Sequence, residues 1–176
     1  MKKVYNLIKF GVVVLFSLMA VGCSFSNIEP SEMAANAQVV KHHQGSVQVK
    51  VTGGETKEDQ LKITNESFKQ SIVNAINKSK LFGSTGDGKS DYRLDVILNS
   101  LDQPAMGFTM TVNMEASWIV TRISDNKMMW RKSISSTQTL GVSDETGGVA
   151  RVRRTTGEAA ARNIEKALAE ISKLDL

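Results

Sequence analysis

The stretch Phe108-Thr-Met-Thr-Val-Asn-Met-Glu-Ala-Ser-Trp-Ile-Val-Thr121 alternates apolar and mostly polar side chains along its whole length. A period of two is typical of a β-strand that buries one face and exposes the other to water. The even-numbered positions from Phe108 to Val120 are all apolar, and they predict the buried face. A strand with one polar face favours an antiparallel sheet that is covered on one side only.

The turn after this strand decides the register of the next strand. A two-residue loop at 125–126 would place Trp130 opposite Thr121, on the polar face. A three-residue loop from Ser124 to Asn126 keeps the apolar residues together, and Asn126 tolerates the left-handed conformation that its third position requires. This register predicts three cross-strand pairs: Val120 with Trp130, Ala116 with Ile134, and Met110 with Leu140.

The C-terminal part of the chain predicts a loop followed by a helix. Residues 141–154 show no periodicity, so we expect a long loop there. Thr155 and Glu158 have the spacing of a capping box, which predicts the first turn of the helix. Apolar residues then recur on one helical face, at Ala160, Ile164, Ala167, Leu168 and Ile171.

Three further elements are predicted before the long strand. Alternation at 47–51 and at 92–98 predicts two strands. Between them, apolar residues at helical spacing predict a helix that Thr64 or Asn65 caps and that ends near Lys80. The resulting order, β-α-β-β-β-α, predicts an α+β fold: a two-layer sandwich with a mostly antiparallel sheet of three or four strands and both helices on one face.

The chain begins with the pattern of a signal peptide. Three lysines lie within the first nine residues, and an apolar run follows at 10–21. That run is shorter than the roughly 20 residues that a membrane-spanning helix needs. It is followed closely by Cys23, the only cysteine of the chain. We therefore expect residues 1–22 to be removed as a lipoprotein signal peptide.

The run Leu18-Met19-Ala20-Val21-Gly22-Cys23 resembles the lipobox of bacterial lipoproteins. The resemblance implies acylation of Cys23, which becomes the new N-terminus. It also implies that signal peptidase recognises the small residues before the cysteine, which are Ala20, Val21 and Gly22, although leucine is commoner where Ala20 stands. In lipoproteins of this kind, an aspartate directly after the acylated cysteine changes the sorting. Ser24 stands at that position here, and the resemblance therefore implies transport to the outer membrane. A lone acylated cysteine leaves no disulfide within the chain.

Residues 23–44 are mostly small or polar and show no sustained apolar period. We predict that they form a lipidated flexible tether, in which His42 and His43 are exposed. Residues 45–176 then form a single periplasmic α+β domain of ordinary size.

Charge and motif context exclude two classes of ligand. Three of the 22 basic residues and none of the 18 acidic residues lie within 1–22, so the remaining chain is nearly neutral, with 19 basic and 18 acidic side chains. This balance lacks the basic footprint of a nucleic-acid-binding protein. Residues 83–90 match the phosphate-binding pattern G-x-x-x-x-G-K-S, but they lie between a predicted helix and a predicted strand, the reverse of a true phosphate loop. We expect a solvated glycine turn and no nucleotide.

Two groups of side chains are candidates for binding. Arg151, Arg153 and Arg154 precede the predicted C-terminal helix, where guanidinium groups and free N–H donors suit an anionic partner, such as a phosphorylated lipid headgroup or an acidic protein surface. A solvated basic loop is the alternative. Met110 and Met114 share the predicted buried face, which favours core packing, with an adaptable apolar groove or a Cu(I) site as alternatives.

Several features together resemble small Gram-negative outer-membrane lipoproteins of the YajG-like kind. They are the lipobox, Tyr92-Arg93-Leu94-Asp95-Val96, the long strand, the hairpin through Asp125-Asn126-Lys127 and the alanine-rich last helix. The element order is also similar to that of the lipopolysaccharide-assembly lipoprotein and of the TolB amino-terminal domain. The resemblance carries over no catalytic residue, cofactor or metal ligand.

The resemblance implies a non-enzymatic protein that its N-terminal acyl chains hold on the outer membrane, facing the periplasm. Its domain is expected to bind an envelope protein as an accessory component of an assembly or transport system. A binding module for a lipid or another amphiphile, which would use the methionine-rich face of the sheet, is the alternative. An enzyme is the third hypothesis.

Overall fold

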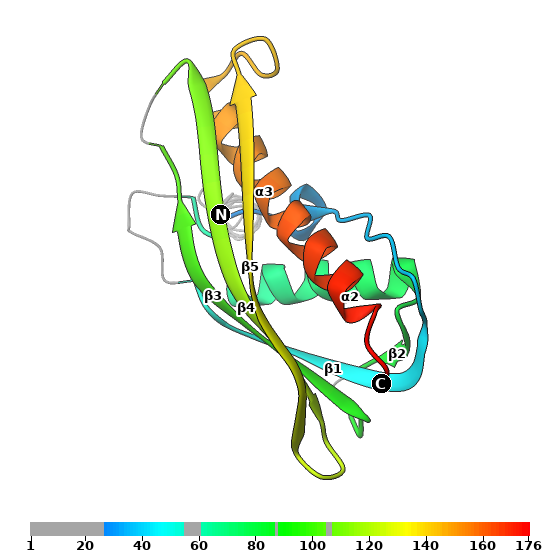
Figure 1. Cartoon of the computed structure of the whole chain (residues 1–176). Helices are drawn as coiled ribbons and strands as arrows, with labels where there is room; N and C mark the ends of the chain where they lie inside the picture. The colour runs from blue at the N-terminus through cyan, green and yellow to red at the C-terminus, as the bar shows by residue number, and fades with distance from the viewer. Residues whose placement is uncertain (1–26, 55–60, 87, 105–106) are drawn as a thin grey trace, which may run out of the picture.

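The computed structural model describes residues 27–54, 61–86, 88–104 and 107–176. Five strands form one sheet in the order β2-β1-β3-β4-β5, and two helices cover one of its faces (Figure 1). The strands are β1 (His43–Gly53), β2 (Phe82–Thr85), β3 (Tyr92–Asp102), β4 (Thr109–Arg122) and β5 (Lys127–Gly141). The helices are α2 (Asn65–Ser79) and α3 (Gly148–Ile171), with a short 3-10 helix η1 (Pro30–Met33) before them.

The predicted α+β architecture and its element order are confirmed. Most paired residues are antiparallel, in the ladders of β4 with β3 and with β5, whereas β1 pairs in parallel with both β2 and β3. The short edge strand β2 was not predicted, because three of its four residues fall in the expected glycine turn at 83–90. At Gly83 a Cβ atom would collide with the carbonyl of Gln44, so the glycine permits this close strand contact.

The predicted register of the hairpin is confirmed for all three pairs: Val120 with Trp130, Ala116 with Ile134, and Met110 with Leu140. The predicted loop is one residue too short, since Arg122 pairs with Lys127 and four residues connect them. A bulge between Val120 and Thr121 absorbs the extra residue and restores the register. Asn126 has the expected left-handed conformation, with φ of 52°.

Trp118 is the centre of the core and joins all the layers. It is fully buried, and the ring of Phe68 from α2 packs against it edge to face at a centroid distance of 6.3 Å. Its indole Nε1 donates to Oδ1 of Asn163 in α3 at 3.0 Å, and Nδ2 of Asn163 donates to the carbonyl of Ile134 in β5 at 2.7 Å. Met110 and Met114 are also buried, which confirms the core-packing interpretation.

The first predicted helix is confirmed and the start of the second is wrong. The hydroxyl of Thr64 accepts from the N–H of Ser67 at 3.0 Å, and α2 ends before Lys80, which is left-handed. In contrast, α3 begins at Gly148, and Thr155 lies inside it. The hydroxyl of Thr155 donates to the Arg151 carbonyl four residues earlier, at 2.6 Å, so this threonine serves the helix interior and does not cap it.

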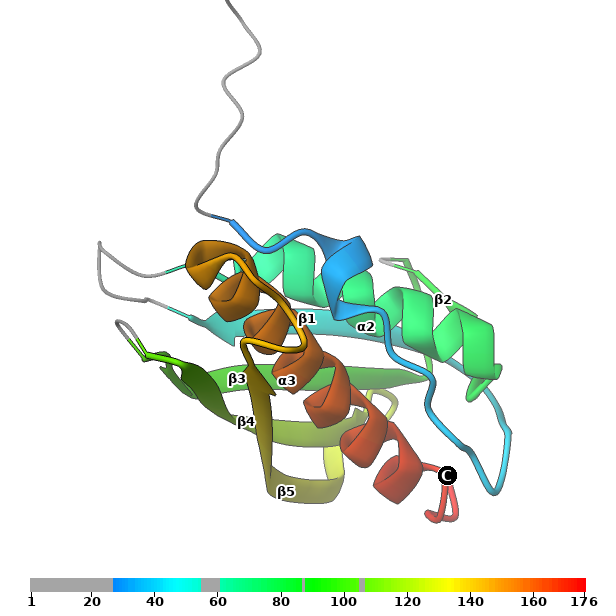
Figure 2. The ribbon, with the colours of Figure 1, turned by 90° about the horizontal axis from the view of Figure 1, so that it is seen from above.

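The prediction of a flexible tether is wrong for residues 27–44. Ile28 and Met33 are fully buried, and η1 packs on both helices (Figure 2). One turn of 3-10 helix is too short to show a period in the sequence, which is why composition alone suggested a linker. His43 belongs to β1 and is buried, with Nε2 at 3.1 Å from the carbonyl of Ile171, whereas His42 is exposed as expected.

Replacing Asn163 with alanine is expected to destabilise the protein by about 3 kcal/mol. The change leaves the buried Trp118 N–H and the Ile134 carbonyl without partners, and each unsatisfied group costs about 1–3 kcal/mol. Chemical denaturation monitored by tryptophan fluorescence measures the difference. Asn99→Ala, which removes an exposed amide on the other face of the sheet, is the control and should cost less than about 1 kcal/mol. Equal losses in the two variants would contradict the central role of Asn163.

Candidate functional site

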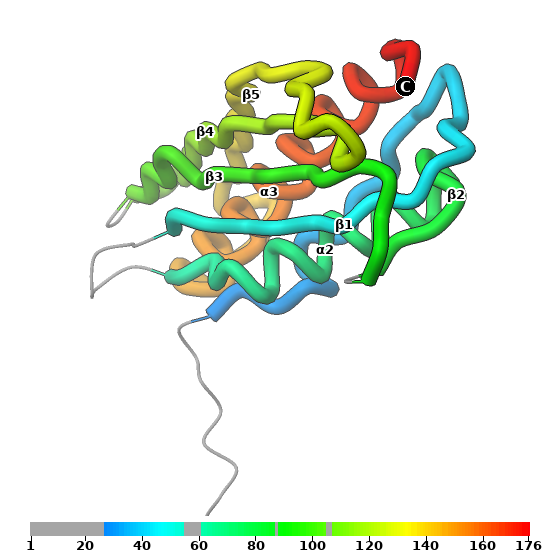
Figure 3. Tube along the Cα trace, turned by 90° about the horizontal axis from the view of Figure 1, so that it is seen from below, coloured from blue at the N-terminus to red at the C-terminus, as the bar shows by residue number. Residues whose placement is uncertain are grey.

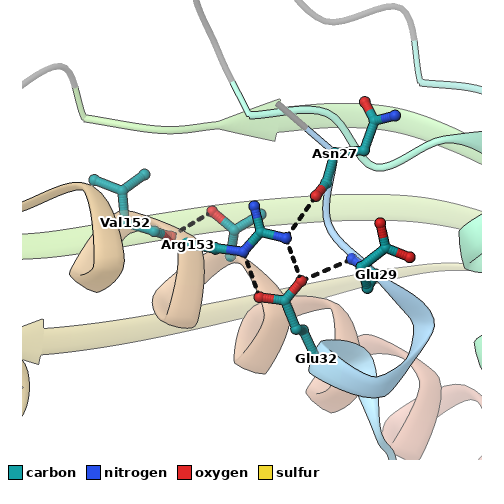
Figure 4. Close-up of polar contacts among 6 residues, drawn as sticks. Asn27, Glu29, Glu32, Val152 and Arg153 are labelled. Atoms are coloured by element: carbon teal, nitrogen blue, oxygen red, sulfur yellow. Dashed lines mark hydrogen bonds and ion pairs between the residues drawn. The ribbon is translucent and has the colours of Figure 1, made fainter. Parts of the chain in front are cut away.

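The first described residues are fastened to α3 by a group that we call the docking cluster: Asn27, Glu29, Glu32 and Arg153 (Figure 4). Arg153 donates from Nε and Nη2 to the two carboxylate oxygens of Glu32, each at 2.6 Å, and from Nη2 to the carbonyl of Asn27 at 2.7 Å. Oε2 of Glu32 also accepts from the N–H of Glu29 at 2.8 Å. A bidentate pair of this kind fixes direction as well as distance.

Backbone contacts complete the attachment of this segment. The N–H of Ile28 donates to the carbonyl of Lys62 at 2.8 Å, and the hydroxyl of Ser71 in α2 donates to the carbonyl of Pro30 at 3.1 Å. At Gly157 in α3 a Cβ atom would collide with the carbonyl oxygen of Glu32. The 3-10 helix therefore lies so close to α3 that only glycine fits at this point.

The ion pair of the docking cluster stays charged over the neutral pH range. Burial raises the pKa of Glu32, but hydrogen bonds from Arg153 and from the Glu29 backbone outweigh it and leave the pKa below its ordinary value of 4.5. The hydrogen bond to Glu32 likewise raises the pKa of Arg153. Both side chains are only about a quarter exposed, at 24% and 29%, which reduces screening by salt.

The three predicted contact arginines do not form one exposed patch, which corrects that prediction. Arg151 is buried, and its guanidinium donates to the carbonyls of Glu145 at 2.8 Å and Gly107 at 3.2 Å. Arg153 belongs to the docking cluster. Arg154 is exposed and pairs with Glu158 at 2.8 Å. The prediction failed because these residues lie in a helix, in which neighbouring side chains point in directions about 100° apart.

The predicted lipidation, signal-peptidase and sorting residues lie outside the described residues. These are Ala20, Val21, Gly22, Cys23 and Ser24. Asn27 is four residues after Cys23, and a fully extended chain covers at most about 3.5 Å per residue, or about 14 Å in total. The structure thus places the end of a very short link on the helical layer of the domain, on the side away from the uncovered face of the sheet (Figure 2).

The uncovered side of β3, β4 and β5 forms the second notable surface, which we call the open face. Its side chains are mainly small hydroxyls and amides, and they bond to one another across the strands. The pairs are Thr111 with Thr139 at 2.9 Å, Ser117 with Ser133 at 3.1 Å, Thr137 with Asn113 at 2.8 Å, and Asn99 with Ser117 at 2.9 Å. The polar positions of the long strand predicted this surface, and its chemistry suits recognition by hydrogen bonds.

Two shallow depressions lie on the described surface. One, of about 300 Å³, adjoins η1 and the start of α2, and the other, of about 810 Å³, adjoins the starts of β1 and β3 and the hairpin tip. Neither is lined by methionine. In the part of the chain that the structure describes, no three His, Cys, Asp or Glu residues are grouped as a metal site would require. The described helices also include none with both the length and the apolarity of a membrane span.

Comparison with known proteins identifies the fold and no family. No protein-family model matches the chain, and no curated protein matches it. Protein XCC0632 from Xanthomonas campestris is similar in structure, with a TM-score of 0.61 at 11% identity over 80% of this chain and 91% of that chain. Protein CT253 from Chlamydia trachomatis gives 0.52 at 10% identity over 74% and 94%. A PelC dodecamer from Paraburkholderia phytofirmans gives 0.50 at 11% identity over 78% and 93%. At such identities the similarity shows a shared fold.

Gly157→Ala is expected to destabilise the protein by about 1–3 kcal/mol, because the added methyl group overpacks the contact of η1 with α3. Helix propensity alone would make the alanine variant more stable by about 1 kcal/mol. A loss of stability therefore indicates the steric contact with η1. Gly148→Ala in the same helix is the matched control: nothing lies near its Cβ position, so its stability should not fall. Thermal unfolding and limited proteolysis of the N-terminal segment measure both effects. A Gly157→Ala protein as stable as the control would contradict the close contact.

Glu32→Gln is expected to lower stability at neutral pH by about 1.5 kcal/mol, through loss of charged hydrogen bonds to Arg153. The folded pKa of Glu32 lies below its unfolded value, so its contribution is complete above about pH 4.5 and is lost as the pH falls through the folded pKa. Denaturation curves of the two proteins should therefore converge in acid. Curves that stay equally far apart at all pH values would argue against the ion pair.

Proposed function

We propose that this chain is a non-enzymatic lipoprotein, anchored by acyl chains on Cys23 in the outer membrane and facing the periplasm. Its domain binds an envelope protein as an accessory component of an assembly or transport system. One observation carries the proposal: the docking cluster fixes Asn27 on the folded domain, four residues after the cysteine of the lipobox. The fold reaches almost to the anchor and leaves about 14 Å of chain between them.

The short link distinguishes this protein from one that scans for partners on a long tether. A linker of about 20 flexible residues would let the domain move over several nanometres. Here Ile28 and Met33 anchor the N-terminal segment in the core, so the domain is held against the membrane surface. The domain therefore binds its partner close to the membrane, at a nearly fixed distance from the bilayer surface.

The open face is the surface that best suits a protein partner. It lies opposite the helical layer from which the anchor segment leaves, so it is accessible when the domain is attached (Figure 3). Its hydroxyl and amide groups are held in place by bonds such as Thr111 to Thr139. Preorganised polar groups lose little side-chain entropy when a partner binds.

The amphiphile-binding alternative loses its main support. Met110 and Met114 are 3% and 1% exposed, and α3 packs against the strand that carries them. The methionine-rich face of the sheet is therefore filled by the core of the protein. The enzyme hypothesis also gains nothing, since one ring nitrogen of each histidine lies against a backbone carbonyl, that of Lys80 for His42 and that of Ile171 for His43.

Cys23→Ser tests the anchor. We expect the wild-type full chain to incorporate labelled palmitate and to sediment with outer membranes, and the variant to lose the label, to keep residues 1–22 and to leave that fraction. The sulfur is the only atom that can carry the thioether to the lipid. Labelling and sedimentation that survive in the variant would overturn the proposal.

Photo-crosslinking tests the partner surface in the same cells. A photoreactive residue at Thr111 on the open face should yield a discrete protein adduct in the Cys23 chain and lose it in the Cys23→Ser chain. The same residue at Asn74, exposed on α2, is the matched control and should yield no such adduct. Equal adducts at both positions would argue against the open face.

A further inference from the structure

Exposed apolar side chains gather at one end of the molecule, in a group that we call the apolar rim: Phe108, Val142 and Val149. Their exposed fractions are 86%, 49% and 68%. Phe108 directly precedes β4, Val142 directly follows β5, and Val149 is in the first turn of α3. Because Thr109 pairs with Gly141 across the sheet, Phe108 and Val142 continue from neighbouring strand ends. Arg151 joins the loops on both sides of this end by its bonds to Gly107 and Glu145.

Phe108 departs from the pattern that surrounds it. Its position in the alternation belongs to the covered face of the sheet, and the sequence predicted it to be buried like Met110. The helical layer does not cover this end of β4, so the ring stands in solvent. Single exposed apolar residues are ordinary, but three at one end of a domain indicate a surface that meets an apolar partner.

The apolar rim lies beside the point where the chain leaves the domain towards Cys23. Val149 and Arg153 are four residues apart in α3, so they lie on the same side of the helix, one turn from each other. Arg153 in turn holds the carbonyl of Asn27. Figure 2 shows the early turns of α3 beside the first described residues, in agreement with this bond.

We propose that the apolar rim inserts into the headgroup region of the bilayer that holds the acyl chains of Cys23. This inference rests on the proposed lipid anchor and goes beyond it, because it defines which way the domain stands. With about 14 Å of chain between Cys23 and Asn27, the rim cannot be far from the membrane surface. Apolar side chains at a membrane surface insert to the depth of the headgroup and acyl boundary.

The opposite end of the molecule provides the comparison. Ile123 and Met128 are also exposed apolar residues, at 38% and 55%, but they lie at the hairpin tip. The tip is at the far end of the β4–β5 ladder from the rim (Figure 1), about 40 Å away along a straight strand. Arg153, which holds Asn27, is one turn of α3 from Val149, so the attachment point of the link is on the rim's side of the molecule. In the proposed orientation the start of α3 meets the membrane and the hairpin points away from it.

The apolar rim is expected to bind the bilayer through its apolar side chains and not through the charges of nearby arginines. The nearby guanidinium groups of Arg151 and Arg153 are already bonded within the protein, and Arg154 pairs with Glu158. Insertion is therefore expected in vesicles with or without anionic lipid. A dependence on anionic lipid would indicate that charge attraction, and not the rim, directs the domain.

The test places tryptophan at the two ends of the molecule in the lipidated full chain. Phe108→Trp and Met128→Trp are both exposed and share the background of the two native tryptophans. Each protein is reconstituted in vesicles of phosphatidylethanolamine and phosphatidylglycerol whose acyl chains carry bromine, which quenches nearby indole rings. We expect loss of fluorescence intensity and a blue shift of emission for Phe108→Trp, and neither for Met128→Trp.

The outcomes separate this inference from the lipid anchor. Flotation of the wild-type protein with the vesicles first shows whether the anchor holds. Flotation without quenching at position 108, or with equal quenching at 108 and 128, overturns the proposed orientation and leaves the anchor intact. A wild-type protein that carries no lipid and does not float overturns both. Quenching at 108 that disappears in Phe108→Trp combined with Val149→Asp, while flotation persists, supports insertion of the rim.

Discussion

The hydrogen bonds of Asn163 with the indole of Trp118 and with the carbonyl of Ile134 are the constraint on which the remaining structure depends. A fully buried indole N–H and a strand carbonyl need partners, and one amide side chain serves both. These bonds determine how α3 lies across β4 and β5, and no apolar contact could do so with the same directionality. The edge-to-face contact with Phe68 brings α2 into the same arrangement. The whole helical layer is thereby positioned from one residue in the centre of the sheet.

The position of α3 then decides where the N-terminal segment attaches. Arg153 and Gly157 lie one turn apart on this helix, and the contact requires both of them. The guanidinium group of Arg153 binds Glu32 and Asn27. Gly157 has no side chain, which lets η1 approach the helix closely. The attachment point of a lipid-anchored domain is usually a matter of linker length. In the proposed function it is a matter of core packing, because Ile28 and Met33 are as buried as Trp118.

The fold thus separates its surfaces by role. The helical side carries the docking cluster and, at one end, the apolar rim, and both serve attachment to the membrane in the proposed function. The open face carries hydroxyl and amide ladders and none of the described helices covers it, and in the proposed function it binds the partner. This division follows from a sheet with only one face buried, since such a sheet always leaves a second, polar face available.

The sequence by itself determined the α+β class, the long strand, the hairpin register and α2, because a period of two or of 3.6 residues and the side-chain cap at Thr64 are local signals. It also predicted Asn126 as the left-handed residue of the turn. Only the tertiary structure decided the early start of α3, the addition of β2, the packing of the N-terminal segment on the helices and the separation of the three arginines. Each of these depends on contacts between segments far apart in the chain, such as Arg153 with Glu32 or Gly83 with Gln44. A single 3-10 turn and a four-residue strand are too short to have a period, so their stability comes from the surface that receives them.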